Sequence, residues 1–143
     1  MAISQAICNS FKKELLEGEH NFGVGDDKFK LALYTAGATL TSATTSYTTS
    51  NEVSPSGQYT AGGGALVNAG TSITAGVARV DFNNLSFTGV TLTARGALIY
   101  NTSLTNAAVA VLDFGSDKTA TSGTFTIQFP APTSTAAILR ISG

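Results

Sequence analysis

The sequence predicts a mainly β protein: an antiparallel β-sandwich or jelly roll with one short N-terminal α-helix. Apolar and polar residues alternate along residues 77–143, and clusters of Gly, Pro, Ser, Thr and Asn separate these runs at short intervals. No helical pattern falls between the runs, so the strands connect through turns and the sheets are antiparallel. The chain has 143 residues, 43% of them hydrophobic, which suits one domain over residues 1–143 with its own core.

The helix is predicted over residues 1–18, between Ser4 as its N-cap and Gly18 as its end. Four apolar residues recur at every fourth position and form one stripe: Ile3, Ile7, Phe11 and Leu15. A helix this short is marginally stable alone. We therefore expect the stripe to pack on the sheet or on a neighbouring subunit.

The next element is a strand with one buried face. Phe29, Leu31 and Leu33 alternate with Lys28, Lys30 and Ala32, which we expect to face solvent. The preceding GVGDDK, residues 23–28, has two glycines and a lysine but lacks the ending of a phosphate-binding loop and precedes a strand. It is interpreted as a turn.

Residues 36–76 form a long Thr/Gly-rich segment that breaks the alternation. A short strand is expected near residues 64–69. The rest is too long for an ordinary loop and too poor in large apolar residues to form its own core. We interpret residues 40–64 as an interaction arm that becomes ordered against another molecule, the alternative being a flexible surface loop. Its expected anchors are Tyr47, Glu52, Val53 and Tyr59.

Residues 77–143 are predicted to supply the core strands, with a bulge at Gly96 and a central strand over residues 107–114. Turns are expected at residues 101–106, 115–123 and 130–135. Eight side chains are predicted to be buried: Val80, Phe82, Leu92, Leu98, Val111, Phe125, Ile127 and Leu139.

The sequence contains few residues that could form a catalytic site. Cys8 and His20 are the only cysteine and histidine, and Cys8 lies beside the apolar stripe, where a buried thiol is inert. Asp81, Asp113 and Asp117 do not form a known calcium-loop pattern. Whether they bind an ion is a question that the sequence leaves open. Arg79, Arg95 and Arg140 are expected to pair with acids. We predict no enzymatic activity and no cofactor or metal.

The charge pattern limits the classes of partner that we expect. Charged residues make up 12% of the chain, and the net charge is −1 without a basic run, so nucleic acid is not an expected partner. No apolar stretch is long enough to cross a membrane. The N-terminal lysines follow the apolar residues, the reverse of a secretory signal. We expect the protein to stay where it is made unless a particle carries it out. So low a charge also indicates a surface partly covered by a partner.

Seven segments, taken in order, resemble a family of small virion proteins in tailed bacteriophages, including phages of aquatic bacteria: FKLALYT, YTTSNEV, GQYTAGG, ARGALIYN, AVAVLDFGSDK, FTIQFP and AAILRI. The resemblance spans nearly the whole chain. It implies a structural part of the particle, made in the cytoplasm of the bacterial host and located in the virion.

Two roles in the particle follow from this resemblance. Small β-sandwich proteins of this size commonly decorate or cement phage capsids, so the first is a capsid decoration protein that binds capsid subunits as a homo-oligomer. The second is a tail, neck or host-contact component. A sugar-binding module is disfavoured because the chain has no Trp.

Overall fold

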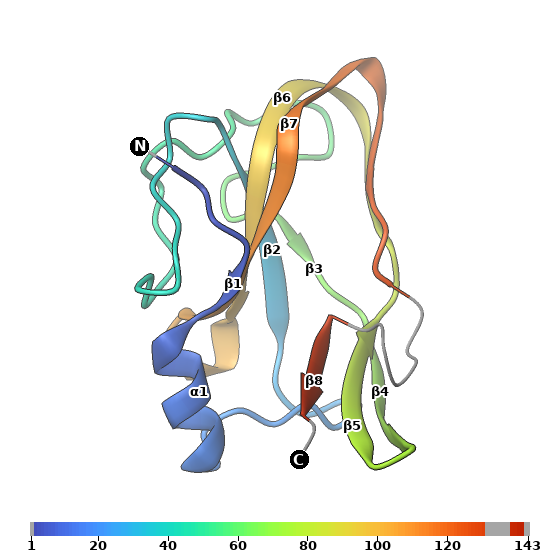
Figure 1. Ribbon diagram of the computed structural model, residues 1–143. Coiled ribbons are helices and arrows are strands. Elements are labelled where there is room, and N and C mark those ends of the chain that lie inside the picture. Colours follow the sequence, from blue (N-terminus) through green and yellow to red (C-terminus); the bar gives the residue numbers. More distant parts are fainter. Residues whose placement is uncertain (1, 131–137, 142–143) are drawn as a thin grey trace.

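The computed structural model describes residues 2–130 and 138–141 and is mainly β, with two antiparallel sheets and one short α-helix (Figure 1). The predicted fold class is therefore confirmed. The larger sheet has the strand order β1-β7-β6-β2-β3, and the smaller sheet the order β4-β5-β8. The elements are β1 (Ala6–Ile7), α1 (Asn9–Leu16), β2 (Phe29–Tyr34), β3 (Gly64–Ala65), β4 (Asn68–Thr74), β5 (Val77–Phe82), β6 (Leu85–Asn101), the 3₁₀ turn η1 (Thr102–Leu104), β7 (Ala107–Ile127) and β8 (Leu139–Ile141).

The N-terminal segment is a strand followed by a helix, so the prediction of one helix over residues 1–18 was wrong in its first half. β1 pairs with β7, Ala6 opposite Val111, and α1 begins only after Cys8, whose own side chain makes no cap bond. The pairing with β7 satisfies backbone groups that a helix would otherwise have bonded internally. The stripe still packs as expected on the core: Phe11 is buried, and Ile3, Ile7 and Leu15 lie against it half-buried.

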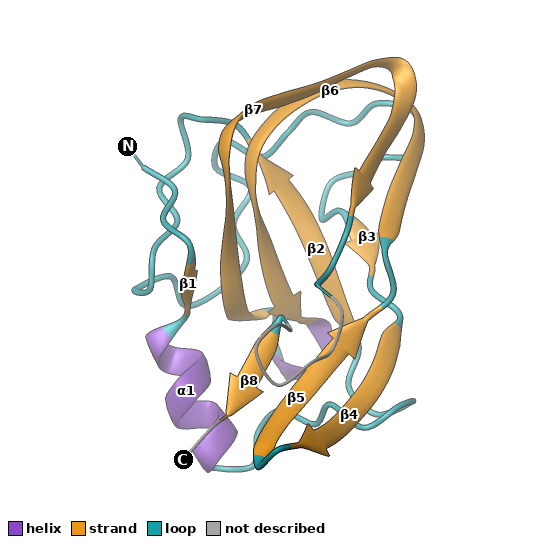
Figure 2. Ribbon diagram, turned by 45° about the vertical axis from the view of Figure 1, so that its right-hand side comes forward, coloured by secondary structure: helices purple, strands orange, loops and turns teal. Residues whose placement is uncertain are grey.

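β6 and β7, two strands of the larger sheet, form one long antiparallel ribbon that arches and turns back on itself (Figure 2). The expected turn at residues 115–123 was wrong, because β7 continues through it and Lys118 pairs with Ala94 of β6. The ribbon bends at register shifts, including the predicted one near Gly96, and Gly115 has a φ of +80° that favours glycine. The turn expected at 101–106 is present around η1.

The core strands over residues 77–141 bury seven of the eight predicted side chains, and Val80 is half-buried. The turn expected at residues 130–135 falls almost wholly outside the described residues. β8 lies within the predicted core strands and pairs with β5, Leu139 opposite Val80.

β2 is buried on both faces, contrary to the expectation of one solvent-facing side. Ala32 and Tyr34 have no exposed surface because the loop over residues 35–63 lies across that face. The Tyr34 hydroxyl donates to the carbonyl of Thr48 at 2.7 Å, and the Tyr47 ring stacks on Tyr100 with 4.7 Å between centroids. The loop therefore acts as a layer of the domain.

The described helix is too short and too polar to span a membrane.

Candidate functional site

The expected interaction arm is folded onto its own domain, and this corrects the role given to its anchors. Tyr59 is fully buried, Val53 is buried, and Tyr47 and Glu52 are half-buried. The N–H of Val53 donates to Leu33 at 2.9 Å, which adds this part of the loop to the edge of β2. The anchors are therefore occupied by the chain itself.

The Glu52 carboxylate is the polar centre of this loop layer. It accepts hydrogen bonds from the Tyr47 hydroxyl at 2.5 Å, the Tyr59 hydroxyl at 2.7 Å and the N–H of Gly62 at 2.7 Å. The Tyr100 hydroxyl donates to the Gly62 carbonyl at 2.6 Å and so fixes the same turn. A single acid in a low-charge loop thus holds several otherwise separate backbone and phenol groups together.

Burial of the phenols has an electrostatic consequence. Burial, followed by the charge of Glu52, raises the pKa of Tyr100 to about 12. Burial is also the largest cause that raises the pKa of Tyr34, Tyr47 and Tyr59 well above the ordinary tyrosine value. All four phenols are therefore held protonated as structural donors.

Cys8 and His20 are both buried in the structure. The Cys8 side chain is buried, and burial raises the pKa of its thiol to about 11. His20 Nε2 lies 2.9 Å from a Glu14 carboxylate oxygen, and its Nδ1 lies 3.0 Å from the Asn101 amide nitrogen. Both ring nitrogens are occupied by contacts that join α1 to the end of β6.

The tautomer of His20 follows from its neighbours. The Asn101 amide oxygen accepts from the N–H of Ser103, and its nitrogen donates to Asp27 at 2.8 Å, which fixes the orientation of this amide. The amide therefore presents N–H to His20 Nδ1, so the neutral ring carries its proton on Nε2 and donates it to Glu14. This arrangement positions the helix.

Two of the three aspartates discussed for ion binding make contacts within the protein. Asp117 lies 3.7 Å from Arg95, and Asp113 accepts from the N–H of Gly115 at 2.9 Å within the bend of β7. Within residues 2–130 and 138–141, no three His, Cys, Asp or Glu side chains gather in a way that would hold a metal ion. Arg79 bonds the hydroxyl of Ser72, not an acid.

An apolar groove runs between α1 and the smaller sheet. Paired residues of an antiparallel ladder project to the same face, so Ala78 and Val80 of β5 share a face with Leu139 and Ile141 of β8. This face lies opposite the helix across a groove of about 730 Å³. Its helix side is formed by Ile7, Phe11, Leu15 and Leu16.

The groove has an apolar floor and a cationic rim. Leu16 is 91% exposed and Ile141 60% exposed, so two large apolar side chains at the rim are in contact with water. The charged groups among its described lining residues are Lys12, Arg79 and Arg140, with no carboxylate. Such a surface suits an apolar segment that carries acidic residues.

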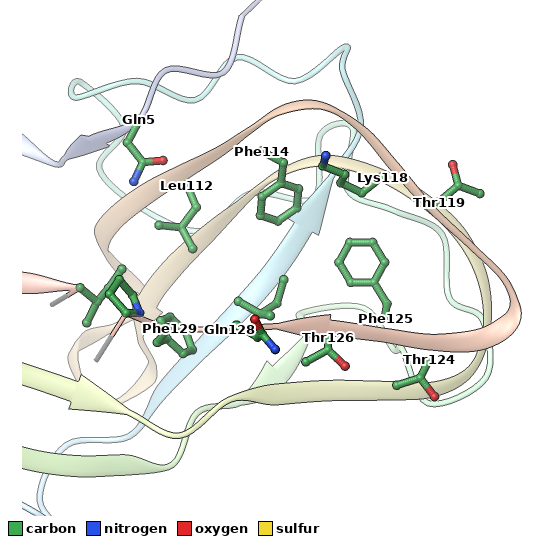
Figure 3. Close-up of a pocket in the computed structure, with 13 residues that line it drawn as sticks. Gln5, Leu112, Phe114, Lys118, Thr119, Thr124, Phe125, Thr126, Gln128 and Phe129 are labelled. Atoms are coloured by element: carbon green, nitrogen blue, oxygen red, sulfur yellow. The ribbon is translucent and has the colours of Figure 1, made fainter. Parts of the chain in front are cut away.

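β7 bends back on itself, and a second cavity of about 630 Å³ lies between its residues 112–119 and its residues 124–127 (Figure 3). Phe114 and Phe125 approach each other in it with 6.1 Å between ring centroids. Pro130 and Ile138 line its rim, on either side of residues outside the described part of the chain. The cavity therefore supports no assignment of a ligand.

Sequence reasoning missed the groove because it depends on the distance between two elements. Leu16 falls within the predicted helix and Ile141 within the predicted core strands, and the sequence pattern gave no sign that either side chain would stay exposed. The sequence feature that could have indicated an exposed apolar surface was the low share of charged residues in the whole chain. Comparison of the chain with family models, with curated proteins and with solved structures gave no match.

Proposed function

We propose that this chain is a structural protein of a tailed bacteriophage particle, acting as a capsid decoration or cement protein that binds capsid subunits. The observation that carries the proposal is the apolar groove between α1 and the β4-β5-β8 sheet. Large apolar side chains that remain in water at a groove are typical of surfaces that another protein covers. The resemblance of the seven sequence segments to small virion proteins supports a structural part of the particle, and the size and β-sandwich class of the chain favour decoration of the capsid by analogy.

The covering partner in this proposal is an apolar segment of a capsid subunit with acidic residues near the rim. Leu16 and Ile141 supply the hydrophobic contact, and Lys12 and Arg79 supply positive charge at the border. Charged groups at a rim mainly steer association and fix orientation, while the apolar floor supplies affinity. The loop over residues 35–63 contributes no lining residue to the groove, so the proposal gives it no part in this contact.

The experiment is quantitative mass spectrometry of purified particles from the phage that encodes the chain. A copy number comparable to that of the major capsid protein supports decoration. A few copies per particle would assign the chain to the tail or neck. Absence of the chain from purified particles would overturn the proposal as a whole.

A variant pair tests the groove itself. Leu16→Lys places a charge on the exposed apolar rim and should lower incorporation into particles at least about tenfold, since a desolvated lysine is costly. Ala61→Lys, at an exposed position of the 35–63 loop, is the matched control and should incorporate normally. Equal incorporation of the two variants would show that the groove is not the contact surface.

A further inference from the structure

In the described part of the chain, no strand pairs with the outer edge of β4. Among the residues that the structure describes, β4 pairs only with β5, and residues 71–74 are all exposed. The strand reads Asn-Ala-Gly-Thr-Ser-Ile-Thr, without the charges or proline that usually block an edge. Its one bulge lies between Asn68 and Gly70, so the stretch after it is regular.

The hairpin geometry shows which peptide groups face outward. β4 and β5 are joined by Ala75 and Gly76, both with positive φ, which is a two-residue type I′ turn. In such a hairpin the flanking pair, Thr74 and Val77, is hydrogen-bonded, and bonded pairs alternate along the ladder. The N–H and C=O groups of Thr71 and Ile73 therefore point away from β5, toward solvent.

Large apolar side chains gather along the same strand. Ile73 is 75% exposed, and Val67, just before the strand, is 59% exposed. Val24 is 71% exposed, and its Cγ2 lies 3.5 Å from the position that a Cβ on Gly70 would take. Three of the five exposed large apolar side chains in the described structure thus flank β4, away from the groove. Figure 1 shows β4 at the outer side of the molecule, with β5 and β8 between it and α1.

We propose that two copies of this chain associate by antiparallel pairing of β4 with β4, which continues the smaller sheet across a two-fold axis. Pairing centred on Ser72 places Thr71 of each copy opposite Ile73 of the other. All outward peptide groups of these two residues are then bonded in both copies. β4 itself is uncharged, so no charged residues of the two strands lie opposite each other, and Ile73 of each copy gains Thr71 of the other as a neighbour. The nearby charge is Arg79, which bonds the Ser72 hydroxyl at 3.0 Å in each copy.

This edge adjoins the groove, because Thr71 also lines the groove, but Ile73 does not line it. The inference goes beyond the proposed function, since it concerns the purified chain without a particle. The test is the mass of the full chain in solution, by sedimentation equilibrium over a concentration series. The wild type should form dimers, and Ile73→Lys should raise the dissociation constant at least about tenfold, as lysine at an edge opposes pairing. Leu16→Lys, on the helix, is the matched control and should dimerise like the wild type.

Cross-linking tests the register. In the proposed pairing Ser72 faces Ser72 of the other copy at a non-hydrogen-bonded site, where Cα atoms are about 4.5 Å apart, within the range that a disulfide spans. Ser72→Cys should therefore form a covalent dimer on mild oxidation, whereas Thr74→Cys should not, because residue 74 faces residue 70. Buried Cys8 remains in both variants.

Three outcomes would overturn the inference. One is a wild-type chain that stays monomeric at every concentration. The edge of β4 would then be available only to a strand of a different protein. Another is an Ile73→Lys variant that dimerises as tightly as the wild type. The third is equally efficient cross-linking of Ser72→Cys and Thr74→Cys. Each of these results leaves the incorporation experiment on Leu16 unaffected, so the two proposals can fail separately.

Discussion

The hydroxyl of Tyr59 lies 2.8 Å from the backbone nitrogen of Leu33 and accepts its hydrogen bond in the interior of the protein. A side chain from the long loop thereby completes the edge of β2, where no strand is present to do so. The same hydroxyl donates to Glu52 at 2.7 Å. One phenol therefore satisfies a buried backbone donor and a carboxylate together.

Tyr59→Phe is expected to lower the free energy of unfolding by about 1–3 kcal/mol, because the Leu33 N–H and the Glu52 carboxylate each lose a partner. Urea unfolding measures the loss, and hydrogen exchange of the Leu33 amide should accelerate. Tyr47→Phe is the control: its hydroxyl contacts Glu52 at a half-buried position where water can replace it, so its cost should be smaller. A Tyr59→Phe protein as stable as the wild type would mean that the loop is open in solution.

The protein should lose stability in alkali. The pKa of every tyrosine is higher in the folded chain than in the unfolded one, so the folded state binds more protons above about pH 10. The tyrosine contribution is fully present below about pH 10 and decreases as the pH rises through the folded-state values. Tyrosinate absorbance should therefore appear together with loss of the folded circular dichroism signal. Titration of the phenols at their ordinary pKa, with the fold intact, would contradict this.

Cys8 should not react with a thiol reagent in the native protein. Its side chain is fully buried, and the raised pKa leaves little thiolate at neutral pH. Ellman's reagent should detect the thiol only after denaturant is added. Reaction of the native protein at the rate of a free cysteine would show that β1 and α1 separate readily from β7.

Ala75→Gly should stabilise the β4–β5 hairpin. Ala75 has a φ of +52°, a conformation that costs a residue with a Cβ about 1 kcal/mol, and glycine adopts it freely. Thermal unfolding should show a higher midpoint. Ala78→Gly, in the strand of the same hairpin, is the control and should be destabilising. If both variants are destabilised, the turn is not of the type I′ form.

Alternation allowed the strands of residues 77–141 to be predicted, because one face of each is apolar: Phe125 and Ile127 are buried as expected. It did not reveal that residues 115–123 continue a strand. Gly115 and Gly123 look like turn residues, yet Thr119 and Ala120 pair with β6 across the bend. Glycines that bend a ribbon and glycines that reverse a chain give the same local pattern.

The loop and the N-terminus were misassigned for a different reason, since both depend on contacts remote in sequence. Ile3 and Ile7 fit a helical stripe, but Ile7 pairs with Ala110 of β7 and Ile3 bridges to Leu40 of the loop, and these contacts outweigh a short helix. Tyr47 and Tyr59 were expected to anchor the loop on another molecule, and in the structure they pack on the domain itself. Tyr34, in a strand expected to have a solvent face, was the available sign that the domain itself would cover them.

The ribbon of β6 and β7 also bears on how the chain folds. Its strands are joined by a short connection around η1, so each pairing can follow the one before it by zipping outward from that end. β1, by contrast, must find Val111 from far away in sequence. We expect the ribbon to form in the folding transition state and β1 to dock after it. Val111→Ala should then slow refolding, whereas Ile7→Ala should mainly speed unfolding, and stopped-flow kinetics that gave the opposite pattern would place nucleation at the N-terminus.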